Sequence, residues 1–463
     1  MGGVVTVEGG QVVLPGGVVR ADLVLRDGRI AALVTDASEH AATAEERIDA
    51  TGLLVLPGGI DAHTHFEEPD PIPLEGFETG GRAAAAGGIT TVVEMPQARP
   101  TTFSRALLDE KIALVRRHAI VDMALWGGVT MQHGQTADDL RAMAAGGAAA
   151  FKSFMASSSP FFPAVTSAHL LEAMTVIAEL GLPYGLHAED DALMQAGIAR
   201  LRAAGRTDPL AHAESRPPLV ETVAVALALT LAEATGCHVH VCHVASAGAL
   251  ALIKAAKGRG VPVTCETCPQ YLVLDTGCLE RRAGFARCAP ALRDPAEVAA
   301  IWPYLLDGTI DLVGSDHCAF TPESKEAGAA DIFDAPLGLA GVQTMLPLLW
   351  GAAVVERGMA PERFADLLSR NPARVFGLDR RKGVLAPGHD ADLVLLDPAA
   401  RWTVRVEDIL HRQPWTPYEG MAVTGRVRRT LRRGETIYDD AKHGAARVPA
   451  APGSGRYLPR GAA

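Results

Sequence analysis

Two histidines stand one residue apart in the stretch PGGIDAHTHFEEPD, residues 57–70, behind an apolar run and ahead of a group of acids. If this stretch ends a β-strand, His63 and His65 lie on the same face, because side chains alternate along a strand with a period of two. Two imidazoles in that arrangement could bind a metal ion. A pair of histidines alone is more often incidental, so the interpretation depends on further ligands elsewhere in the chain.

Other chemically capable side chains close apolar, strand-like segments further along the chain. They are Lys152 after AAAF, His187 after LPYGL, His243 after CHVHVC and Asp316 after IDLVGS. In a barrel of alternating strands and helices, catalytic groups lie at the C-terminal ends of the strands. Side chains of these types at five strand ends therefore predict a single metal site.

The segment CHVHVCHV requires a choice between histidines. His238, His240 and Cys242 share one face of the expected strand, and His243 points to the other. We favour His243 as the ligand because it comes last, nearest the loop, and because the turn ASAG follows it. His238 and His240 are the alternative metal pair, and otherwise are structural histidines.

The order of elements predicts an α/β fold, a (β/α)8 TIM barrel with a small β-sandwich-like domain. Short strand-like runs separated by Gly-Gly and Asp-Gly turns occupy residues 1–56. Apolar β-rich segments then alternate with Ala- and Leu-rich helical ones over residues 57–379, which favours a closed parallel barrel. Strand-like character returns over residues 380–445, so both chain ends are expected to build the small domain. Residues 446–463, rich in Pro, Gly and Ala, are expected to form an extended or mobile tail.

Composition restricts the class of partner. The 463 residues carry a formal net charge of −11 and contain no long basic block, which disfavours nucleic acid and anionic membranes and favours a small-molecule substrate. No apolar run approaches the roughly 18 residues of a membrane span, and no signal peptide is recognised, so a cytoplasmic protein is expected. The seven cysteines suit reduced thiols, and Cys265 and Cys268 of CETC are interpreted as buried small side chains.

The motifs resemble those of the cyclic amidohydrolases, the group of the amidohydrolase superfamily that contains dihydroorotases, allantoinases and hydantoinases or dihydropyrimidinases. The matching motifs, in family order, are PGGIDAHTH, EGFETGGRAAAAGGITTVVEMP, FKSFM, GLHAED, HVCHVAS, TCPQYL, GSDHCAF and NPARVFGL. They extend over nearly the whole chain, and such a set is highly specific for the group.

The resemblance implies a zinc hydrolase with two metal ions per chain. By this analogy His63, His65 and Asp316 hold the first ion, His187 and His243 hold the second, and Lys152, carboxylated by carbon dioxide, bridges both. A metal-bridging hydroxide would attack the ring carbonyl, and Asp316 would carry its proton to the leaving nitrogen. The ring would open to an N-carbamoyl or ureido acid. Tetramers are common in families of this kind, which implies a homo-oligomer.

The motifs point to different rings. The stretches EGFETG and TPYEG resemble allantoinases, which continue the histidine motif as Glu-Pro-Gly-Arg where this chain has Asp70-Pro71. Glu67 stands where dihydroorotases carry an arginine, and Ser157 stands where hydantoinases carry a tyrosine. The candidate substrate-binding residues are Glu67, Gln97, Ser157, Cys288, Ala289 and Leu337. We expect an allantoinase-like enzyme that converts allantoin to allantoate.

Several alternatives stay open at this point. A hydantoinase or dihydropyrimidinase acting on 5-substituted hydantoins or dihydropyrimidines is the main one, and a dihydroorotase is less favoured. A non-catalytic scaffold of the same fold is disfavoured because all six ligand positions are filled. A mononuclear deaminase would use fewer ligands and no bridging lysine. A purely structural zinc is disfavoured because such sites are usually closed and often contain cysteine.

Overall fold

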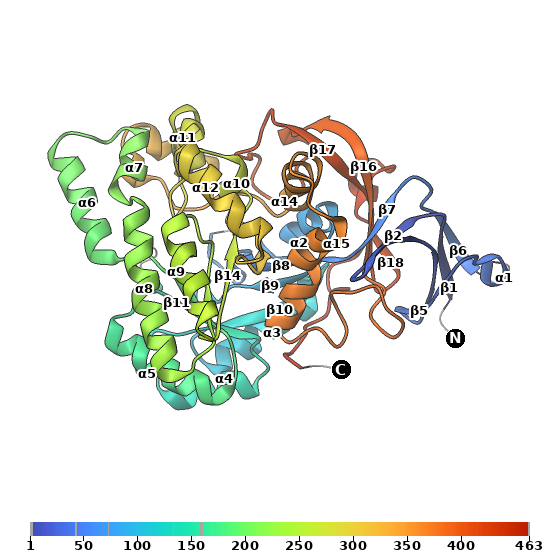
Figure 1. Ribbon diagram of the computed structural model, residues 1–463, viewed down its shortest axis with the longest axis horizontal. Coiled ribbons are helices and arrows are strands. Elements are labelled where there is room, and N and C mark those ends of the chain that lie inside the picture. The colour runs from blue at the N-terminus through green and yellow to red at the C-terminus, as the bar shows by residue number, and fades with distance from the viewer. Residues whose placement is uncertain (1–2, 42–43, 73, 133, 158–160, 462–463) are drawn as a thin grey trace.

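The computed structural model describes residues 3–41, 44–72, 74–132, 134–157 and 161–461. A barrel of strands and helices occupies one side of the molecule, and β-sheets built from both ends of the chain occupy the other (Figure 1). The expected fold class, a TIM barrel with an accompanying β domain, is confirmed. The expected boundaries at residues 57, 380 and 446 stay predictions.

Eight parallel strands form the barrel in sequence order. They are β8 (Gly59–Thr64), β9 (Ile89–Glu94), β10 (Asp122–Gly128), β11 (Ala150–Phe154), β12 (Tyr184–His187), β13 (Val239–Val241), β14 (Val263–Thr267) and β15 (Leu312–Val313). The first and last strands meet beyond the end of β15, where Thr64 forms a parallel bridge with His317 and the His65 N–H donates to the His317 carbonyl at 2.8 Å. The barrel closes at its C-terminal end, where the expected ligands lie.

Helices cover the outside of the barrel. The larger ones are α2 (Phe77–Ala86), α3 (Arg105–His118), α4 (Ala137–Ala145), α5 (Ser167–Leu180), α6 (Asp191–Ala203), α8 (Pro218–Thr235), α9 (Ala247–Gly258) and α12 (Pro295–Leu306). Shorter ones are α1 (Ser38–Ala41), α7 (Pro209–Ser215), α10 (Gln270–Val273), α11 (Thr276–Arg282), α13 (Pro322–Glu326), α14 (Met345–Leu349), α15 (Pro361–Ala365) and α16 (Asn371–Val375). Strands such as β9 and β10 are buried along their whole length, because helices cover the outside of the barrel and side chains fill the inside.

Local signals in the sequence set the helix ends. The Thr166 hydroxyl accepts a hydrogen bond from the His169 N–H at the start of α5, and Gly181 ends that helix in the left-handed conformation. Asp294 caps α12 by accepting from the N–H groups of Ala296 and Glu297. These caps fix where each helix begins, and hence the length of the loop that leads to it from the preceding strand.

Both chain ends contribute to one six-stranded sheet. Its order is β18 (Glu435–Asp439), β17 (Ala422–Arg432), β16 (Leu393–Thr403), β7 (Leu54–Pro57), β2 (Gln11–Leu14) and β3 (Gly17–Arg20). A second sheet has the order β5 (Arg29–Val34), β4 (Asp22–Arg26), β1 (Val4–Glu8) and β6 (Ala44–Asp49). Strand β7 pairs with β2 from the start of the chain and with β16 from its end, so this sheet depends on both.

The end of the chain lies along the barrel. The Met123 N–H donates to the Arg456 carbonyl at 2.8 Å, and the Leu458 N–H donates to the Met123 carbonyl at 2.8 Å. The Tyr457 hydroxyl donates to the Gly147 carbonyl at 2.8 Å. This part of the expected tail is an extended arm docked at the start of β10.

The apolar stretch Pro209–Thr235, which joins α7 and α8, is long and apolar enough to cross a membrane by length and composition. This corrects the expectation that no run approaches that length. In the structure α8 packs in the outer layer of the barrel against α5 and α9, and the core helix of a soluble protein passes the same test.

Candidate active site

Five of the six candidate ligands, from four of the five strand ends, line one cavity. Its volume is about 650 Å³, and His63, His65, His187, His243 and Asp316 all contribute to its wall. The cavity lies where barrel strands end, so the closed barrel brings together side chains that are up to 253 positions apart in the sequence (63 to 316). Lys152 lies on β11 and is fully buried.

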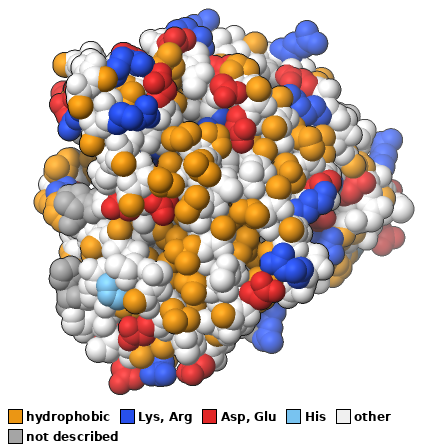
Figure 2. All heavy atoms as spheres, turned by 60° about the vertical axis from the view of Figure 1, so that its left-hand side comes forward, with side chains coloured by type: hydrophobic (Ala, Val, Ile, Leu, Met, Phe, Trp, Pro, Cys, Tyr) orange, Lys and Arg blue, Asp and Glu red, His pale blue; other side chains and the backbone are white. Residues whose placement is uncertain are grey.

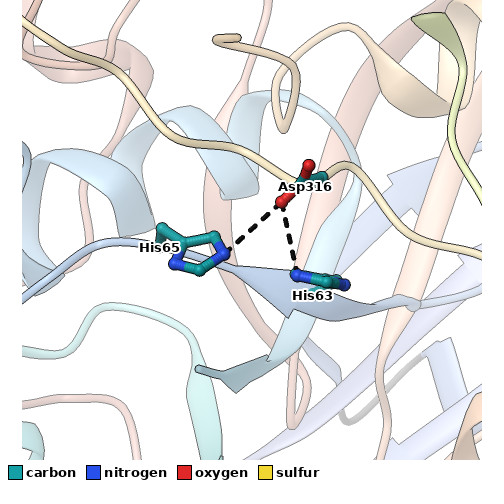
Figure 3. Close-up of side chains that lie close together, drawn as sticks. All are labelled: His63, His65 and Asp316. Carbon is teal, nitrogen blue, oxygen red and sulfur yellow. Dashed lines mark ion pairs between the residues drawn. The ribbon is translucent and has the colours of Figure 1, made fainter. Parts of the chain in front are cut away.

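His63 and His65 converge on Asp316 (Figure 3). The Nε2 atoms of the two rings lie 3.3 and 3.4 Å from the same Asp316 oxygen, Oδ1. One nitrogen from each ring and one carboxylate oxygen therefore surround a common point, and these three residues form a group able to hold a metal ion. The ring of His63 is fixed from behind, because its Nδ1–H donates to Glu266 on β14.

His187 and His243 form the second pair. The Nδ1 atom of His187 lies 3.1 Å from Nε2 of His243, so two ring nitrogens face each other. The Nε2–H of His187 donates to Glu189 at 2.9 Å, and Glu189 in turn accepts from Arg216 at 3.0 Å. This chain of contacts holds the His187 ring with Nδ1 directed at His243, which is how outer carboxylates orient metal-binding histidines.

His243 and Asp316 share an unusual backbone conformation. Their φ angles are 39° and 49°, in the left-handed region that residues other than glycine rarely adopt. Simple alternation would direct His243 away from the face that carries His240 and Cys242. The positive φ turns the chain beyond β13, and the His243 ring contacts the rings of His187 and His63. Strain of this kind at two candidate ligand positions is typical of a functional site.

The alternative histidines of that strand have structural contacts. His238 and His240 each bond the Thr264 hydroxyl, at 2.9 and 2.8 Å. His240 also lies 3.4 Å from Glu266. The structure therefore brings His243, rather than this pair, to the cavity.

Lys152 places an amine next to the histidines without giving it a partner. Its Nζ atom is buried and has no hydrogen-bond partner among the described residues. Its Nζ atom lies 5.1 Å from the centroid of the Phe154 ring. An ammonium group carries three donors, so its burial without acceptors is unfavourable. A carboxylated side chain held by metal ions would remove that problem.

The protonation states suit metal binding. Burial lowers the pKa of His63 and His187 and holds that of His243 well below its usual value, so these rings are neutral and offer lone pairs. Burial alone would raise the pKa of Asp316, but the neighbouring His63 and His65 hold it below its ordinary value. The donor set is thus three neutral imidazoles, His65, a carboxylate and an unpartnered amine, which fits two cations.

A second group of possible ligands lies deeper, formed by His63, Cys242 and Glu266. The two carboxylate oxygens of Glu266 already lie against Nδ1 of His63 and Nε2 of His240. Burial raises the pKa of the Cys242 thiol to about 12, which keeps it protonated. We therefore interpret this group as one that orients His63, not as a metal site. Cys265 and Cys268 are fully buried free thiols.

Most of the predicted substrate-binding residues do line the cavity. They are Glu67, Gln97, Ser157, Ala289 and Leu337. Cys288 is the exception, because its side chain is buried behind the wall and its Sγ lies 3.2 Å from the Pro290 carbonyl. Alternation along the extended segment turns Ala289 toward the cavity and Cys288 away from it.

Several residues of the site were not predicted from the sequence. Glu266 and Glu189 orient His63 and His187, and Arg216 and Arg287 line the cavity. The available signal was a charged residue within or just after an apolar strand, as in VTCETC and GLHAED. A charged residue in such a position is predicted to be buried, but the local sequence does not predict which distant side chain it contacts.

The fold and the clustered candidate ligands are those expected of a barrel hydrolase, and comparison with known proteins identifies the family. The model of the amidohydrolase family matches residues 54–437. An allantoinase of Rubrobacter xylanophilus is 42% identical over 454 residues, covering 98% of this chain and 96% of that protein. An allantoinase of Solibacter usitatus is 39% identical, with 94% of this chain and 93% of that protein covered.

Solved structures with the same fold include cyclic-amide hydrolases. The L-hydantoinase (dihydropyrimidinase) from Arthrobacter aurescens has a TM-score of 0.94 and 34% identity, covering 99% of this chain and 100% of that one. Dihydropyrimidinase from Brevibacillus agri has a TM-score of 0.91 and 31% identity, covering 99% and 98%. The chain belongs to the amidohydrolase family, and it is an enzyme of the class that hydrolyses C–N bonds in cyclic amides.

Proposed function

We propose that this enzyme is an allantoinase-like hydrolase with two zinc ions per chain, which opens the hydantoin ring of allantoin to give allantoate. The environment of Lys152 is the observation that supports two metal ions rather than one. Its buried, unpartnered Nζ lies in a site that also holds the His63, His65 and Asp316 group and the His187 and His243 pair. A carbamate on Lys152 would supply anionic oxygen ligands for the metal ions.

Each ligand has a part in this proposal. His63, His65 and Asp316 would hold one zinc ion, His187 and His243 the other, and carboxylated Lys152 both. A bound zinc pair supplies an acidified water molecule and polarises the carbonyl of the ring. Asp316 would accept the proton of the attacking water at its carboxylate and donate it to the leaving ring nitrogen. The low pKa of Asp316 keeps it ionised, and therefore able to accept, near neutral pH.

Two observations support allantoin as the substrate. The relatives named above that are 42% and 39% identical are allantoinases, and arginines 216 and 287 give the cavity a polar wall. The alternative is a hydantoinase or dihydropyrimidinase, which the structural neighbours support. Side chains such as Phe333, Phe320 and Leu337 would then accept an apolar ring substituent.

The remaining alternatives differ in what they require of Lys152. A non-catalytic scaffold has no use for a complete set of six ligands. A mononuclear deaminase does not require a bridging lysine. In such an enzyme the burial of the unpartnered Lys152 amine would destabilise the fold without contributing to metal binding. Loss of the Lys152 side chain therefore separates these possibilities.

The test is ring opening by protein purified with zinc and bicarbonate. Allantoin is compared with 5-substituted hydantoins, dihydrouracil and dihydroorotate, and zinc is counted per chain. We expect two zinc ions and preference for allantoin. Lys152→Ala should lose metal and activity and regain part of the activity with short carboxylic acids. Lys254→Ala, which removes an exposed lysine paired with Asp307 at 2.7 Å, is the control.

One zinc ion per chain together with an active Lys152→Ala variant would refute the binuclear proposal. Preference for a hydantoin or dihydropyrimidine would refute allantoin as the substrate and leave the metal site in place.

We also propose that the enzyme is a homo-oligomer. Hydrophobic side chains gather on the face that carries α6 and α8 (Figure 2). On α8, Leu219, Val223 and Leu227 are 60%, 38% and 36% exposed and follow one another at the spacing of a single helix face. Light scattering of wild type and Leu219→Glu tests this proposal, with dissociation expected for the variant. A cytoplasmic location stays a prediction of the sequence.

A further inference from the structure

Arg287 is a buried cation at the wall of the active-site cavity. The residue is 6% exposed and its side chain contributes to the cavity lining. A guanidinium group has five N–H donors and no acceptor, so a buried one needs oxygen or nitrogen atoms around it. The partners that Arg287 already has therefore indicate what it is free to bind.

The other arginines of the cavity wall are paired. Arg216 donates to Glu189 at 3.0 Å, and Nε of Arg99 donates to Asp70 at 2.7 Å. Within the described part of the chain, no carboxylate lies within ion-pair distance of Arg287. The acids nearest in charge effect are Asp331 and Asp334, and both pair with Arg202 at 3.1 Å.

A buried histidine orients the guanidinium. His212, on α7, is fully buried, and its Nε2–H donates to the Cys288 carbonyl at 2.7 Å. Burial and the charges of Arg216 and Arg287 hold the pKa of His212 well below its usual value, so the ring is neutral and Nδ1 keeps its lone pair. That lone pair accepts from Nε of Arg287 at 3.5 Å. No contact within the described chain occupies the two Nη groups.

The backbone around Arg287 is held just as firmly. Its carbonyl accepts from the Nζ of Lys325 at 3.0 Å and from the Gly338 N–H at 3.1 Å. Lys325 also donates to the Gly338 carbonyl at 2.8 Å. These bonds join the segment of Arg287 and Ala289 to the segment of Leu337 and Gly338, the two segments from which we expect substrate contacts.

We infer that Arg287 is a specificity-determining residue that binds an oxygen acceptor on the exocyclic substituent of the substrate ring. This inference rests on the proposed function and names its substrate class, rings whose substituent carries a ureido or carboxyl carbonyl. Both groups present the same chemistry, an acceptor oxygen in a plane that a guanidinium fork matches. An alkyl substituent would leave the fork unpaired, and sites built around a hydrogen bond discriminate strongly against ligands that lack it.

The experiment compares kcat/KM for hydantoins that differ only at position 5: ureido (allantoin), carboxymethyl, n-propyl and hydrogen. For Arg287→Met we expect a loss of about 10- to 100-fold with the polar substituents and less than about threefold with propyl or hydrogen. Arg287→Lys keeps the charge but loses the fork, so it should lie between wild type and Arg287→Met. A larger loss for carboxymethyl than for ureido would identify an anionic substituent as the preferred ligand.

Two controls separate specificity from damage to the fold. Arg259→Met removes an arginine that pairs with Glu233 and does not line the cavity, and it should leave the ratio of polar to propyl substrates unchanged. Zinc content and thermal unfolding of each variant show whether it is intact. Titration calorimetry with the ring-opened ureido acids repeats the comparison without turnover.

Equal losses on all four rings, or no loss on any, would overturn the inference. Its failure is distinct from failure of the proposed function. If wild type rejects allantoin but opens other hydantoins, the allantoinase proposal fails, and the effect of Arg287→Met on the ratio of carboxymethyl to propyl still decides the role of Arg287.

Discussion

The carboxylate of Glu266 accepts a hydrogen bond from Nδ1 of His63 and thereby leaves Nε2 of the same ring directed at Asp316. The two residues are 203 positions apart and lie on β14 and β8. The contact fixes both the tautomer and the orientation of His63, so Glu266 belongs to the site although it does not line the cavity.

Replacing Glu266 with Gln should weaken metal binding. The amide has nearly the same size but no charge, and loss of such an outer contact typically lowers metal affinity about 10- to 100-fold. Zinc retained after dialysis against chelators of increasing strength measures the effect. Glu221→Gln, at another buried carboxylate that contacts Arg293 instead of a candidate ligand, is the control. Unchanged zinc retention in Glu266→Gln would contradict the assigned role.

Gly185 on β12 should not tolerate even a methyl group. A Cβ at this position would lie 2.6 Å from the ring of Trp126, which is fully buried and donates from Nε1 to the Ala62 carbonyl at 3.2 Å. The Trp126 ring also packs against Phe376, with the ring centroids 5.0 Å apart, so Gly185→Ala should lower the free energy of unfolding by about 1–3 kcal/mol. Chemical denaturation measures this loss. Gly258→Ala, where a Cβ meets nothing within 4 Å, should cost nothing; equal behaviour of the two variants would argue against overpacking.

Asp70 and Arg99 should depend on each other. Asp70 is one of the two residues that depart from the allantoinase motif, and its Oδ2 accepts from Nε of Arg99 at 2.7 Å at the cavity wall. The Arg99 side chain is 25% exposed, so solvent weakens the pair. We expect a coupling free energy of about 1 kcal/mol in a double-mutant cycle of Asp70→Asn and Arg99→Met, followed by chemical denaturation. Additive losses would show that the pair does not act as a unit.

Asp122 should make stability depend on pH in the acid range. It is fully buried at the start of β10 and lies 2.7 Å from Nζ of Lys382, with Arg433 as a second partner. Burial alone would raise the pKa of Asp122, but Lys382 and Arg433 lower it well below its ordinary value. A lowered pKa means that the unfolded chain takes up the proton first, so the stabilisation is present above about pH 4 and is lost as the pH falls below it.

The matched variant for this prediction is Asp122→Asn. At pH 7 it should lose about 3 kcal/mol or more, because Lys382 and Arg433 are left with one buried acid fewer. Urea unfolding at pH 7, 5 and 3.5 should show the difference between wild type and variant shrinking with acid. A difference that stays constant across this range would mean that folding does not lower the pKa of Asp122, which would contradict the assigned ion pairs.

The candidate ligands could be predicted from the sequence because each stands at the end of an apolar segment. Strand periodicity and the turn after each strand are local properties, and they were enough to place His63, His187 and Asp316 at strand ends. The contacts of Glu266 and Glu189 could not be predicted in the same way. An acid in an apolar strand indicates that a partner must exist, because a buried carboxylate needs one. The identity of that partner depends on which strands the barrel brings together.

Sequence by itself determined the class of fold, the family and the positions of the six candidate ligands, because strand and helix periods and family motifs are written along the chain. The tertiary structure decided where those side chains point. The positive φ of His243 directs its ring to the cavity against simple alternation. Cys288 is buried behind the cavity wall, whereas Ala289 lines it. The Arg287 side chain is oriented by a hydrogen bond to His212, 75 residues away. Side-chain direction beyond a strand end depends on backbone angles that are set when distant segments pack, and a local pattern does not contain that information.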